Sequence, residues 1–284
     1  MPLVVVNPAA GRGRVARLLP RIKKLVGDRA RVLVTEGPGH ATRAVAESAE
    51  ERIVAVGGDG TIHEVLRGLR KEQVLGVVPV GSGNDFARML GLNKLSLPEA
   101  IERALSAPAR RVDLGRVNGE PYGVSLGFGF DAGVARRALV APRALVGMPR
   151  YLYAIFAELK NLSLPRLELR SQGKQLYFGP VLLAAVMNGT AYGGGIPVAP
   201  MADPADGRLE AMLAGRFSRA GVLFILPRLI LGRHLSHPEV HHFSAPEFEL
   251  VFDRPTPYHA DGEYLGEGTR FRAWVEPGGL LVAA

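Results

Sequence analysis

Residues 54–64 read Val-Ala-Val-Gly-Gly-Asp-Gly-Thr-Ile-His-Glu, and this stretch decides how the first part of the chain folds. The apolar run at residues 53–56 predicts a buried strand, and Gly57-Gly58-Asp59-Gly60 predicts a tight loop. Thr61 and Glu64 have the spacing of a helix capping box, so we expect a helix N-cap at Thr61. A strand, a glycine loop and a helix N-terminus in this order present backbone N–H groups to an anion. The stretch therefore favours a nucleotide-phosphate site over a plain strand-to-helix turn.

A second glycine loop follows another apolar run, at residues 74–80. Two further apolar runs near the N-terminus end in polar residues, Asn7 and Thr35. The second loop reads Gly81-Ser82-Gly83-Asn84-Asp85, in which Asn84 is a good N-cap for the next helix. Open α/β sheets bind ligands at the edge where the carboxyl ends of parallel strands meet. We therefore expect all four strand ends to line one site.

The hydrophobic pattern changes its period near the middle of the chain. Residues 1–112 alternate short apolar strands with helical segments, which predicts a doubly wound α/β domain. Asn118-Gly119 is a strong hairpin signal, and most of the segments that follow have the pattern of antiparallel strands. We expect residues 113–274 to form a mainly antiparallel β-sandwich domain.

Composition narrows the class of protein. The chain has 284 residues, 47% of them hydrophobic, and no cysteine, so disulfides and thiolate metal sites are excluded. No basic and apolar leader follows Met1, and glycines and prolines interrupt the uncharged residues 175–202, so we expect a cytoplasmic protein. The net charge of +8 suits anionic phosphates or lipid headgroups. Without an aromatic-interleaved basic stretch, nucleic acid is not an expected partner.

Together the motifs resemble the diacylglycerol kinase catalytic-domain family of lipid kinases, which includes bacterial soluble diacylglycerol kinases and sphingosine kinases. The resemblance covers nearly the whole chain. The Gly-Gly-Asp-Gly-Thr loop alone is shared with NAD kinases, whereas the second glycine loop and a late Asp-Gly-Glu favour the lipid kinases. The matching pieces are Asn7-Pro8 with Gly11, Thr35, Gly57-Gly58-Asp59-Gly60-Thr61 with Glu64, Gly81-Ser82-Gly83-Asn84-Asp85-Phe86-Ala87-Arg88, residues 200–209, and Asp261-Gly262-Glu263.

The resemblance implies a Rossmann-like, NAD kinase-like nucleotide domain at residues 1–112, to which a last strand at about 275–284 returns. It also implies a lipid-substrate domain at residues 113–274. ATP and Mg²⁺ are the implied cofactors. The implied ATP-binding residues are Asn7, Thr35, Gly57, Gly58, Asp59, Gly60, Thr61, Gly81, Ser82, Gly83, Asn84 and Asp85.

Phosphoryl transfer to an alcohol needs a phosphate cradle, Mg²⁺ and a group that takes or orients the hydroxyl proton. The resemblance places Asp261-Gly262-Glu263 in the interdomain cleft and makes it the source of that group. Either Glu263 or Asp261 can be the base, because residues on either side of one glycine need not both face the substrate. Without the resemblance, an Asp-Gly turn in a hairpin is the simpler interpretation.

A second acidic segment, Asp203-Pro204-Ala205-Asp206-Gly207-Arg208, has two interpretations. It is either a solvated turn that closes a hairpin or a site for a hard cation. In proteins that it resembles, an Asp side chain and two backbone carbonyls hold a structural Mg²⁺. That set corresponds to Asp206 with the carbonyls of Asp203 and Arg208, although relatives often have a hydrophobic residue at the last position.

The sequence therefore predicts an ATP-dependent lipid kinase. An NAD kinase-like enzyme and a catalytically silent relative are the alternatives. The expected partner is a lipid substrate at a membrane surface, with a homodimer left open. Residues 216–233 predict an amphipathic helix broken at Pro227 and packed on the β domain, in preference to a segment that meets lipid. His234, His237, His241 and His242 predict a surface loop rather than a zinc site.

Overall fold

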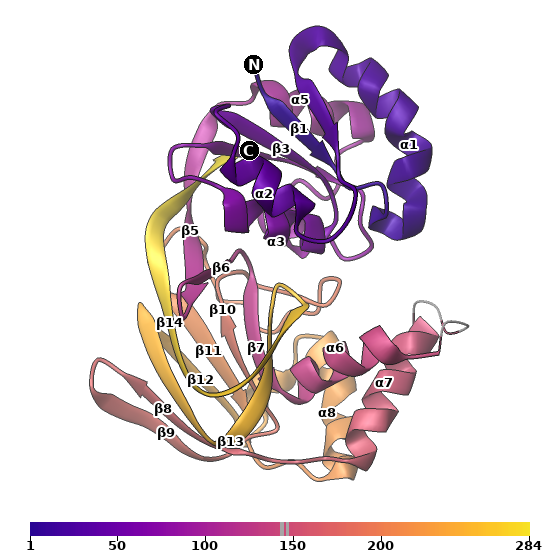
Figure 1. The fold of residues 1–284 in the computed structure, drawn as a ribbon. Coiled ribbons are helices and arrows are strands. Elements are labelled where there is room, and N and C mark those ends of the chain that lie inside the picture. Colours follow the sequence, from indigo (N-terminus) through magenta and orange to yellow (C-terminus); the bar gives the residue numbers. More distant parts are fainter. Residues whose placement is uncertain (143–144, 146–147) are drawn as a thin grey trace.

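The computed structural model describes the whole chain except residues 143–144 and 146–147. Within the described residues, 14 strands form one mixed sheet that runs through two lobes, one above the other in Figure 1. The upper, N-terminal lobe has parallel strands covered by helices, and the lower, C-terminal lobe is mainly antiparallel. The predicted fold class is confirmed. Both chain ends lie in the upper lobe (Figure 1).

Four parallel strands form the sheet of the N-terminal lobe, in the order β2-β1-β3-β4. They are β1 (Leu3–Val6), β2 (Arg31–Val34), β3 (Arg52–Gly57) and β4 (Val74–Pro79). The helices of this lobe are α1 (Ala10–Val26), η1 (Gly27–Arg29), α2 (His40–Ala46), α3 (Asp59–Gly68), α4 (Asp85–Met89) and α5 (Leu97–Ser106). The central strands are apolar on both faces because each face is covered by helices.

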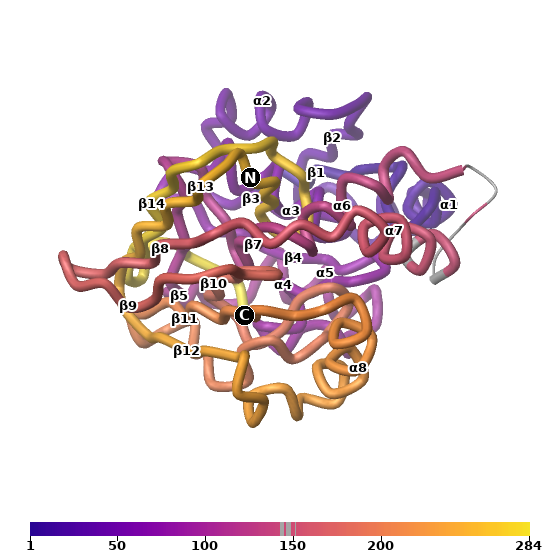
Figure 2. The backbone as a smooth tube through the Cα atoms, turned by 90° about the horizontal axis from the view of Figure 1, so that it is seen from below, coloured from indigo at the N-terminus to yellow at the C-terminus, as the bar shows by residue number. Residues whose placement is uncertain are grey.

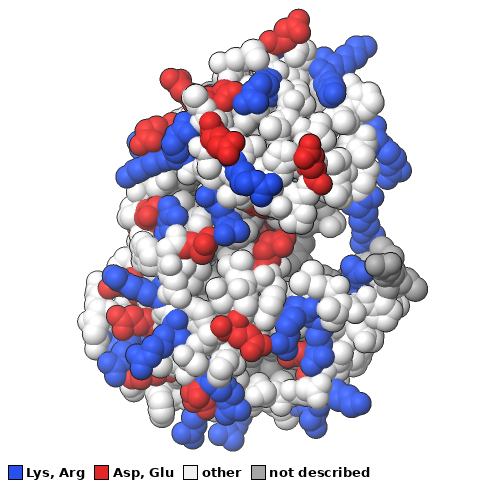
Figure 3. Space-filling view, in the orientation of Figure 1, with Lys and Arg blue, Asp and Glu red and all other residues white. Residues whose placement is uncertain are grey.

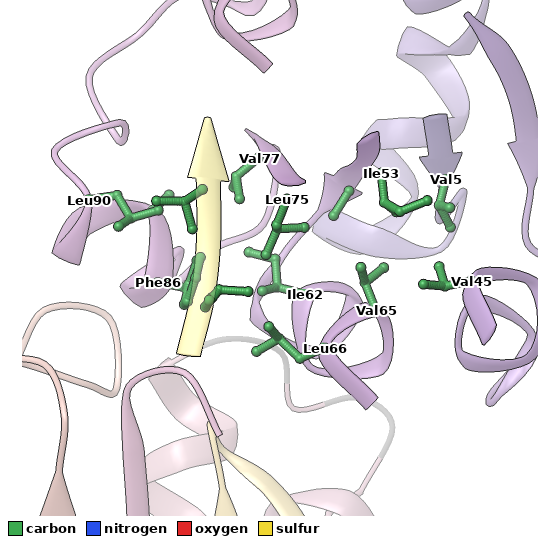
Figure 4. Close-up of a cluster of buried hydrophobic side chains, with 14 of the residues drawn as sticks. Val5, Val45, Ile53, Ile62, Val65, Leu66, Leu75, Val77, Phe86 and Leu90 are labelled. Carbon is green, nitrogen blue, oxygen red and sulfur yellow. The ribbon is translucent and has the colours of Figure 1, made fainter. Parts of the chain in front are cut away.

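Alternate side chains of these strands enter two separate cores. Val5, Ile53 and Leu75 pack against α2, α3 and α4 (Figure 4). Val4 and Val54 point the other way and pack against α1 and α5. This is the doubly wound arrangement that the alternation of strands and helices predicts. The helices cover the two faces of the sheet, so the carboxyl ends of the strands are surrounded by loops and by the N-termini of helices.

The C-terminal lobe contains most of the remaining strands. Its core is apolar and rich in aromatic rings, with Phe128 packed on Phe252, Tyr258 and Phe271. The strands are β5 (Ala109–Val117), β6 (Glu120–Tyr122), β7 (Ser125–Gly129), β8 (Arg166–Ser171), β9 (Lys174–Pro180), β10 (Leu183–Met187), β11 (Leu209–Ala214), β12 (Val240–Ala245), β13 (Glu247–Ala260) and β14 (Glu263–Ala283). Asn118 and Gly119 have positive φ and close the hairpin between β5 and β6, as predicted.

Three helices lie together on one side of the C-terminal lobe, and Figure 2 shows them along one side of the molecule seen from below. They are α6 (Phe130–Val140), α7 (Met148–Lys160) and α8 (Arg219–Ile230), and a short helix, η2 (His234–Ser236), follows α8. Their inner side chains form one cluster that includes Phe130, Ala154 and Ile225. Among the described residues, no helix is long and apolar enough to cross a membrane.

One strand, β14, belongs to both lobes. Its first half, residues 263–274, pairs with β13 in the C-terminal lobe, and its second half, residues 273–283, pairs with β5. Its last residues lie parallel to β4, where Leu281 pairs with Val74 and Val282 with Leu75. Leu280 and Val282 enter the core under α3 and α4. The C-terminal end of the chain therefore completes the N-terminal sheet.

Three local expectations are wrong. Helix α3 begins at Asp59 with Gly58 as its N-cap, because the hydroxyl of Thr61 accepts a hydrogen bond from Asn7 instead of capping a helix. Helix α8 continues through Pro227, because packing of the residues around the proline outweighs the lost hydrogen bond. His234 is buried, with its Nε2 atom 2.9 Å from the carbonyl oxygen of Val198, so it does not belong to a surface loop.

The Leu75 side chain is fully buried between the sheet and the helices that carry the glycine loops. Replacing it, Leu75→Ala, should lower the free energy of unfolding by about 2–5 kcal/mol, because the change leaves a cavity that the rigid sheet cannot fill. Chemical denaturation measures the loss. Val140→Ala is the matched control, because Val140 is 81% exposed. Equal stabilities of the two variants would contradict this description of the core.

Candidate active site

The two glycine loops lie against each other at the carboxyl ends of β3 and β4. A Cβ atom added to Gly58 would lie 3.0 Å from Cα of Gly81, and one added to Gly81 would lie 2.5 Å from Cα of Gly58. Side chains at either position would force the loops apart. A Cβ on Gly57 would clash with the side chain of Thr61. The glycines are therefore required by the close approach of the two backbones, and they leave no Cβ atom between the loops and a ligand.

The second loop is held in shape by Asn84. Its Nδ2 donates to the carbonyl of Gly81 at 2.9 Å, and its Oδ1 accepts from the N–H of the same residue at 2.9 Å. Asn84 has a positive φ of 55° and precedes α4, but its side chain closes the loop instead of capping the helix. Ser82 is exposed at the tip of this loop.

Asn7 joins the end of β1 to the first loop. Its Nδ2 donates to Oγ1 of Thr61 at 3.0 Å, and its Oδ1 accepts from the N–H of Ala9 at 3.0 Å. Thr35, at the end of β2, is buried and donates its N–H to the carbonyl of Val6. The structure thus brings the four predicted strand ends to one edge of the sheet.

Two carboxylates converge on Gly83. A Cβ atom there would lie 2.8 Å from Oδ2 of Asp59 and 3.5 Å from Oδ2 of Asp85. Asp59 accepts from the N–H of Phe86 at 3.1 Å, and Asp85 from the N–H of Gly194 at 2.9 Å. Burial raises the pKa of Asp59 to about 6, and the nearby carboxylates of Asp85 and Asp261 add to this shift. Burial also raises the pKa of Asp85.

This pair suits a cation that offsets the repulsion between its members. Mg²⁺ takes few protein carboxylates and keeps water and phosphate oxygens as its other ligands. Asp59 and Asp85 meet that requirement beside the glycine loops, although the described residues contain no cluster of three or more His, Cys, Asp or Glu side chains suited to a metal.

Asp261 is a buried anchor of the turn between β13 and β14. Its carboxylate accepts N–H groups from Gly123 at 2.8 Å, Val124 at 2.8 Å and Ser125 at 3.1 Å, and Nδ1 of His63 lies 3.3 Å away. Burial acts to raise the pKa of Asp261, but the hydrogen bond with His63 and the backbone N–H groups outweigh it, so the pKa is lowered. Four donors therefore surround this carboxylate.

Glu263 has a different environment from its neighbour in the same turn. The residue is exposed, and Oε1 of its carboxylate lies so close to Gly60 that a Cβ atom there would clash with it. Glu263 therefore faces the first glycine loop across the junction of the two lobes. On the right of Figure 3, the surface recedes between the upper and lower lobes.

A polar network beside this turn was missed by the sequence analysis. Tyr192 donates its hydroxyl to Oδ2 of Asp131 at 2.6 Å, and Nε2 of His259 lies 3.1 Å from the same oxygen. The N–H of Gly262 donates to Nδ1 of His259 at 3.2 Å, so Nε2 carries the proton toward Asp131. The available signal was Asp131 itself, an acidic residue in the first turn of a helix that follows a strand ending in glycine.

The predicted magnesium segment forms a tight turn on the surface. Asp203 accepts from the N–H of Ala205 at 3.0 Å, and Asp206 from the N–H of Arg208 at 2.9 Å. The guanidinium of Arg208 donates to Oγ of Ser244 at 2.9 Å. Both aspartates are exposed, and the structure does not bring them to the glycine loops.

A buried residue that the sequence analysis did not single out, Asp113, fastens this turn to the sheet. Its carboxylate accepts the N–H of Gly207 at 2.7 Å and the N–H of Gly278 at 2.7 Å. Its own N–H donates to the carbonyl of Pro204 at 2.7 Å. The turn at residues 203–208 is thereby linked to β5 and β14 at the junction of the lobes.

Comparison with known proteins gives matches over the whole chain. The model of the diacylglycerol kinase catalytic domain matches residues 1–117, and that of the YegS C-terminal NAD kinase beta sandwich-like domain matches residues 124–284. The chain is 32% identical to "Probable lipid kinase YegS-like" of Chromohalobacter salexigens, covering 99% of this chain and 92% of that one. It is 28% identical to "Diacylglycerol kinase" of Bacillus subtilis, covering 93% and 89%.

Solved structures share the fold. A diacylglycerol kinase from Bacillus anthracis superposes with a TM-score of 0.72 at 21% identity, covering 99% of this chain and 96% of that one. An NAD kinase from Archaeoglobus fulgidus, solved in complex with ATP, superposes with a TM-score of 0.61 at 14% identity, covering 100% and 94%.

The raised pKa of Asp59 has a consequence for stability. Its folded pKa of about 6 lies above the usual 3.8, so the native state binds this proton more tightly and loses stability as the pH rises between these values. Between pH 4 and pH 7, wild type should lose about 2–3 kcal/mol of its free energy of unfolding through this carboxyl. Asp59→Asn lacks the titrating group, so its free energy of unfolding should not show this loss. Urea denaturation across this pH range measures it. Asp28→Asn, at an exposed site, should behave as wild type, and identical pH profiles for all three proteins would refute the assignment.

Proposed function

The chain belongs to the diacylglycerol kinase catalytic-domain family, and we propose that it transfers the γ-phosphoryl group of ATP to the hydroxyl group of a lipid. The observation that carries this proposal is the position of Glu263. A carboxylate from the C-terminal lobe lies over Gly60, beside a phosphate-type loop of the N-terminal lobe. That arrangement puts an acceptor for a hydroxyl proton next to the expected place of the transferred phosphate.

The glycine loops serve the nucleotide. Their backbones are free of side chains where they meet, and α3 begins directly behind the first loop, so N–H groups and the helix dipole favour phosphate. Asn7 and Thr35 extend the same edge toward the rest of the nucleotide. The archaeal NAD kinase that shares the fold was solved with ATP, which supports ATP as the donor.

Mg²⁺ fits two places in this chain with different roles. Asp59 and Asp85 would hold the ion that screens the phosphate charge, since their carboxylates converge next to the second loop. Asp206, with the carbonyls of Asp203 and Arg208, would hold a structural ion at the surface turn that is hydrogen-bonded to Asp113. When bound, the first ion neutralises charge that develops on the phosphate oxygens.

The residues of the chain do the rest of the chemistry. Glu263 accepts the proton of the lipid hydroxyl. At the same time the hydroxyl oxygen bonds to the γ-phosphorus, and the bond from this phosphorus to the bridging oxygen breaks, so that ADP leaves. Asp261 is the positioning residue, because it fixes the turn that carries Glu263 and at the same time contacts His63 on α3. The lipid itself is proposed to reach the site from a membrane surface.

The test is an assay with labelled ATP and Mg²⁺ on micelles of diacylglycerol, phosphatidylglycerol, a sphingoid base or a polyprenol, with NAD as a separate substrate. A labelled lipid product supports the proposal and identifies the lipid class. Phosphorylation of NAD alone would instead support an NAD kinase-like enzyme. ATP binding in calorimetry without any labelled product would support a silent relative.

Glu263→Gln should lower kcat at least 100-fold while the affinity for ATP and the melting temperature stay near wild type. The amide keeps the shape of the side chain and removes only its ability to take a proton. Steady-state kinetics and calorimetry provide the measurements. Glu267→Gln is the matched control, because Glu267 is an exposed carboxylate on the same strand that pairs with Arg136. Wild-type turnover in Glu263→Gln would show that the base lies elsewhere.

Asp261→Ala should lower the free energy of unfolding by at least about 3 kcal/mol, since three buried N–H groups lose their acceptor. Asp261→Asn keeps one acceptor oxygen and tolerates the positive φ of 52°, so this variant should fold and keep measurable turnover. Denaturation and kinetics on both variants separate an anchor from a base. Normal stability with abolished turnover in Asp261→Asn would make Asp261 the base instead.

A further inference from the structure

Helix α8 is apolar on both of its sides. Its sequence, Arg-Ala-Gly-Val-Leu-Phe-Ile-Leu-Pro-Arg-Leu-Ile, has no acidic residue, and only its two arginines are charged. Val222 and Ile225 are buried in the cluster that joins α6, α7 and α8. A helix that is hydrophobic all round is normally covered all round. The sequence pattern predicts only one apolar side, so the exposed side needs its own explanation.

The outward side of α8 is a continuous apolar face. Leu223 is 47% exposed and Phe224 is 79% exposed. One heptad further on, Ile230 is 59% exposed and Leu231 is 67% exposed. Positions seven apart share one side of a helix, and Pro227 lies between the two pairs on the same side. We call these five residues the α8 face.

The segment that carries the α8 face is basic. Residues 216–238 contain four arginines and no aspartate or glutamate. Arg219 is held at the start of the helix by the carbonyls of Leu159 and Lys160 at the end of α7, whereas Arg228 is exposed next to the apolar stripe. In Figure 3, blue side chains lie over the lower right of the molecule, the region of α6, α7 and α8 in Figure 1.

The neighbouring helices also expose apolar side chains, and one of them starts beside the candidate active site. On α7, Phe156 is 58% exposed, and at the end of α6, Val140 is 81% exposed. Helix α6 starts at the network of Asp131 and His259, two residues before Asp261. Its 11 residues span roughly 16 Å, so Val140 at its far end lies within the length of an extended lipid from that network.

We propose that the α8 face docks on the surface of a membrane that contains anionic lipids. The proposal rests on the proposed function, since a lipid substrate must be taken from a bilayer. An apolar stripe flanked by arginines, without acidic residues, is the composition of helices that lie in the membrane interface. With 12 residues the helix is too short to span a bilayer. A second copy of the chain suits this face poorly, because a two-fold interface would bring arginines of α8 close to each other.

The experiment is flotation of the full-length protein with vesicles of phosphatidylcholine alone or with one third phosphatidylglycerol. Wild type should bind the anionic vesicles more tightly, and added salt should weaken that binding. The double variant Leu223→Ser/Phe224→Ser should bind at least tenfold more weakly. Arg228→Gln should lose roughly fivefold on anionic vesicles and nothing on neutral ones. Phe178→Ser is the matched control, since Phe178 is 61% exposed on β9, away from α8, and its binding should be unchanged.

Turnover separates this proposal from the proposed function. On a short-chain diacylglycerol dispersed as monomers, the double variant should phosphorylate substrate at the wild-type rate, and it should lose activity only on vesicles. Absence of any lipid phosphorylation by wild type would overturn the proposed function and leave the vesicle-binding result standing. Wild-type vesicle binding by the double variant would overturn docking. Conversion of a dimer to a monomer by the double variant, with vesicle binding unchanged, would assign the face to a second copy.

Discussion

The arrangement of the two lobes at the candidate site depends on one buried carboxylate. Asp261 lies in a turn of the C-terminal lobe. Its carboxylate accepts three hydrogen bonds from the backbone N–H groups of residues 123–125 and contacts His63 of the N-terminal lobe. A buried charge without donors would destabilise the fold, so these contacts must form together. Because His63 lies one turn after Asp59 on α3, the same carboxylate sets the distance between the phosphate-type loop and Glu263. The position of the proposed base is thus a consequence of folding.

A second constraint acts inside the N-terminal lobe, where two backbones touch. The approach of Gly58 to Gly81 leaves no room for a Cβ atom on the second loop, and Asn84 maintains the shape of that loop from within. Asp59 reaches across to the N–H of Phe86 at the start of α4. The two loops are therefore one rigid unit, and this unit places two carboxylates together at an energetic cost that a cation would relieve.

Local patterns were sufficient for the fold class and for the strand ends that carry Asn7, Thr35 and the glycine loops. They were insufficient wherever a side chain finds its partner far along the chain. Thr61 has the spacing of a helix cap, but its hydroxyl oxygen accepts a hydrogen bond from Asn7, 54 positions earlier. Asp261 and Glu263 are equivalent in sequence, and only the N–H groups of a distant strand distinguish them. The network of Asp131, Tyr192 and His259 spans 128 positions and has no local spacing to recognise. The exposed side of α8 could not be predicted because burial is decided by the helices beside it.

The strand β14 is part of the connection between the two lobes. Only β5 and β14 run between them in the described chain, and their ladder is interrupted between Glu276 and Leu280, where Pro277, Gly278 and Gly279 lie. Proline cannot donate a hydrogen bond to a β-ladder, and glycine restricts the backbone least. The connection between the lobes is therefore weakest at this point. The carboxylate of Asp113 accepts a hydrogen bond from the N–H of Gly278 at that point. The same carboxylate binds the turn at residues 203–208, so a change of the angle between the lobes at this point would also move that turn.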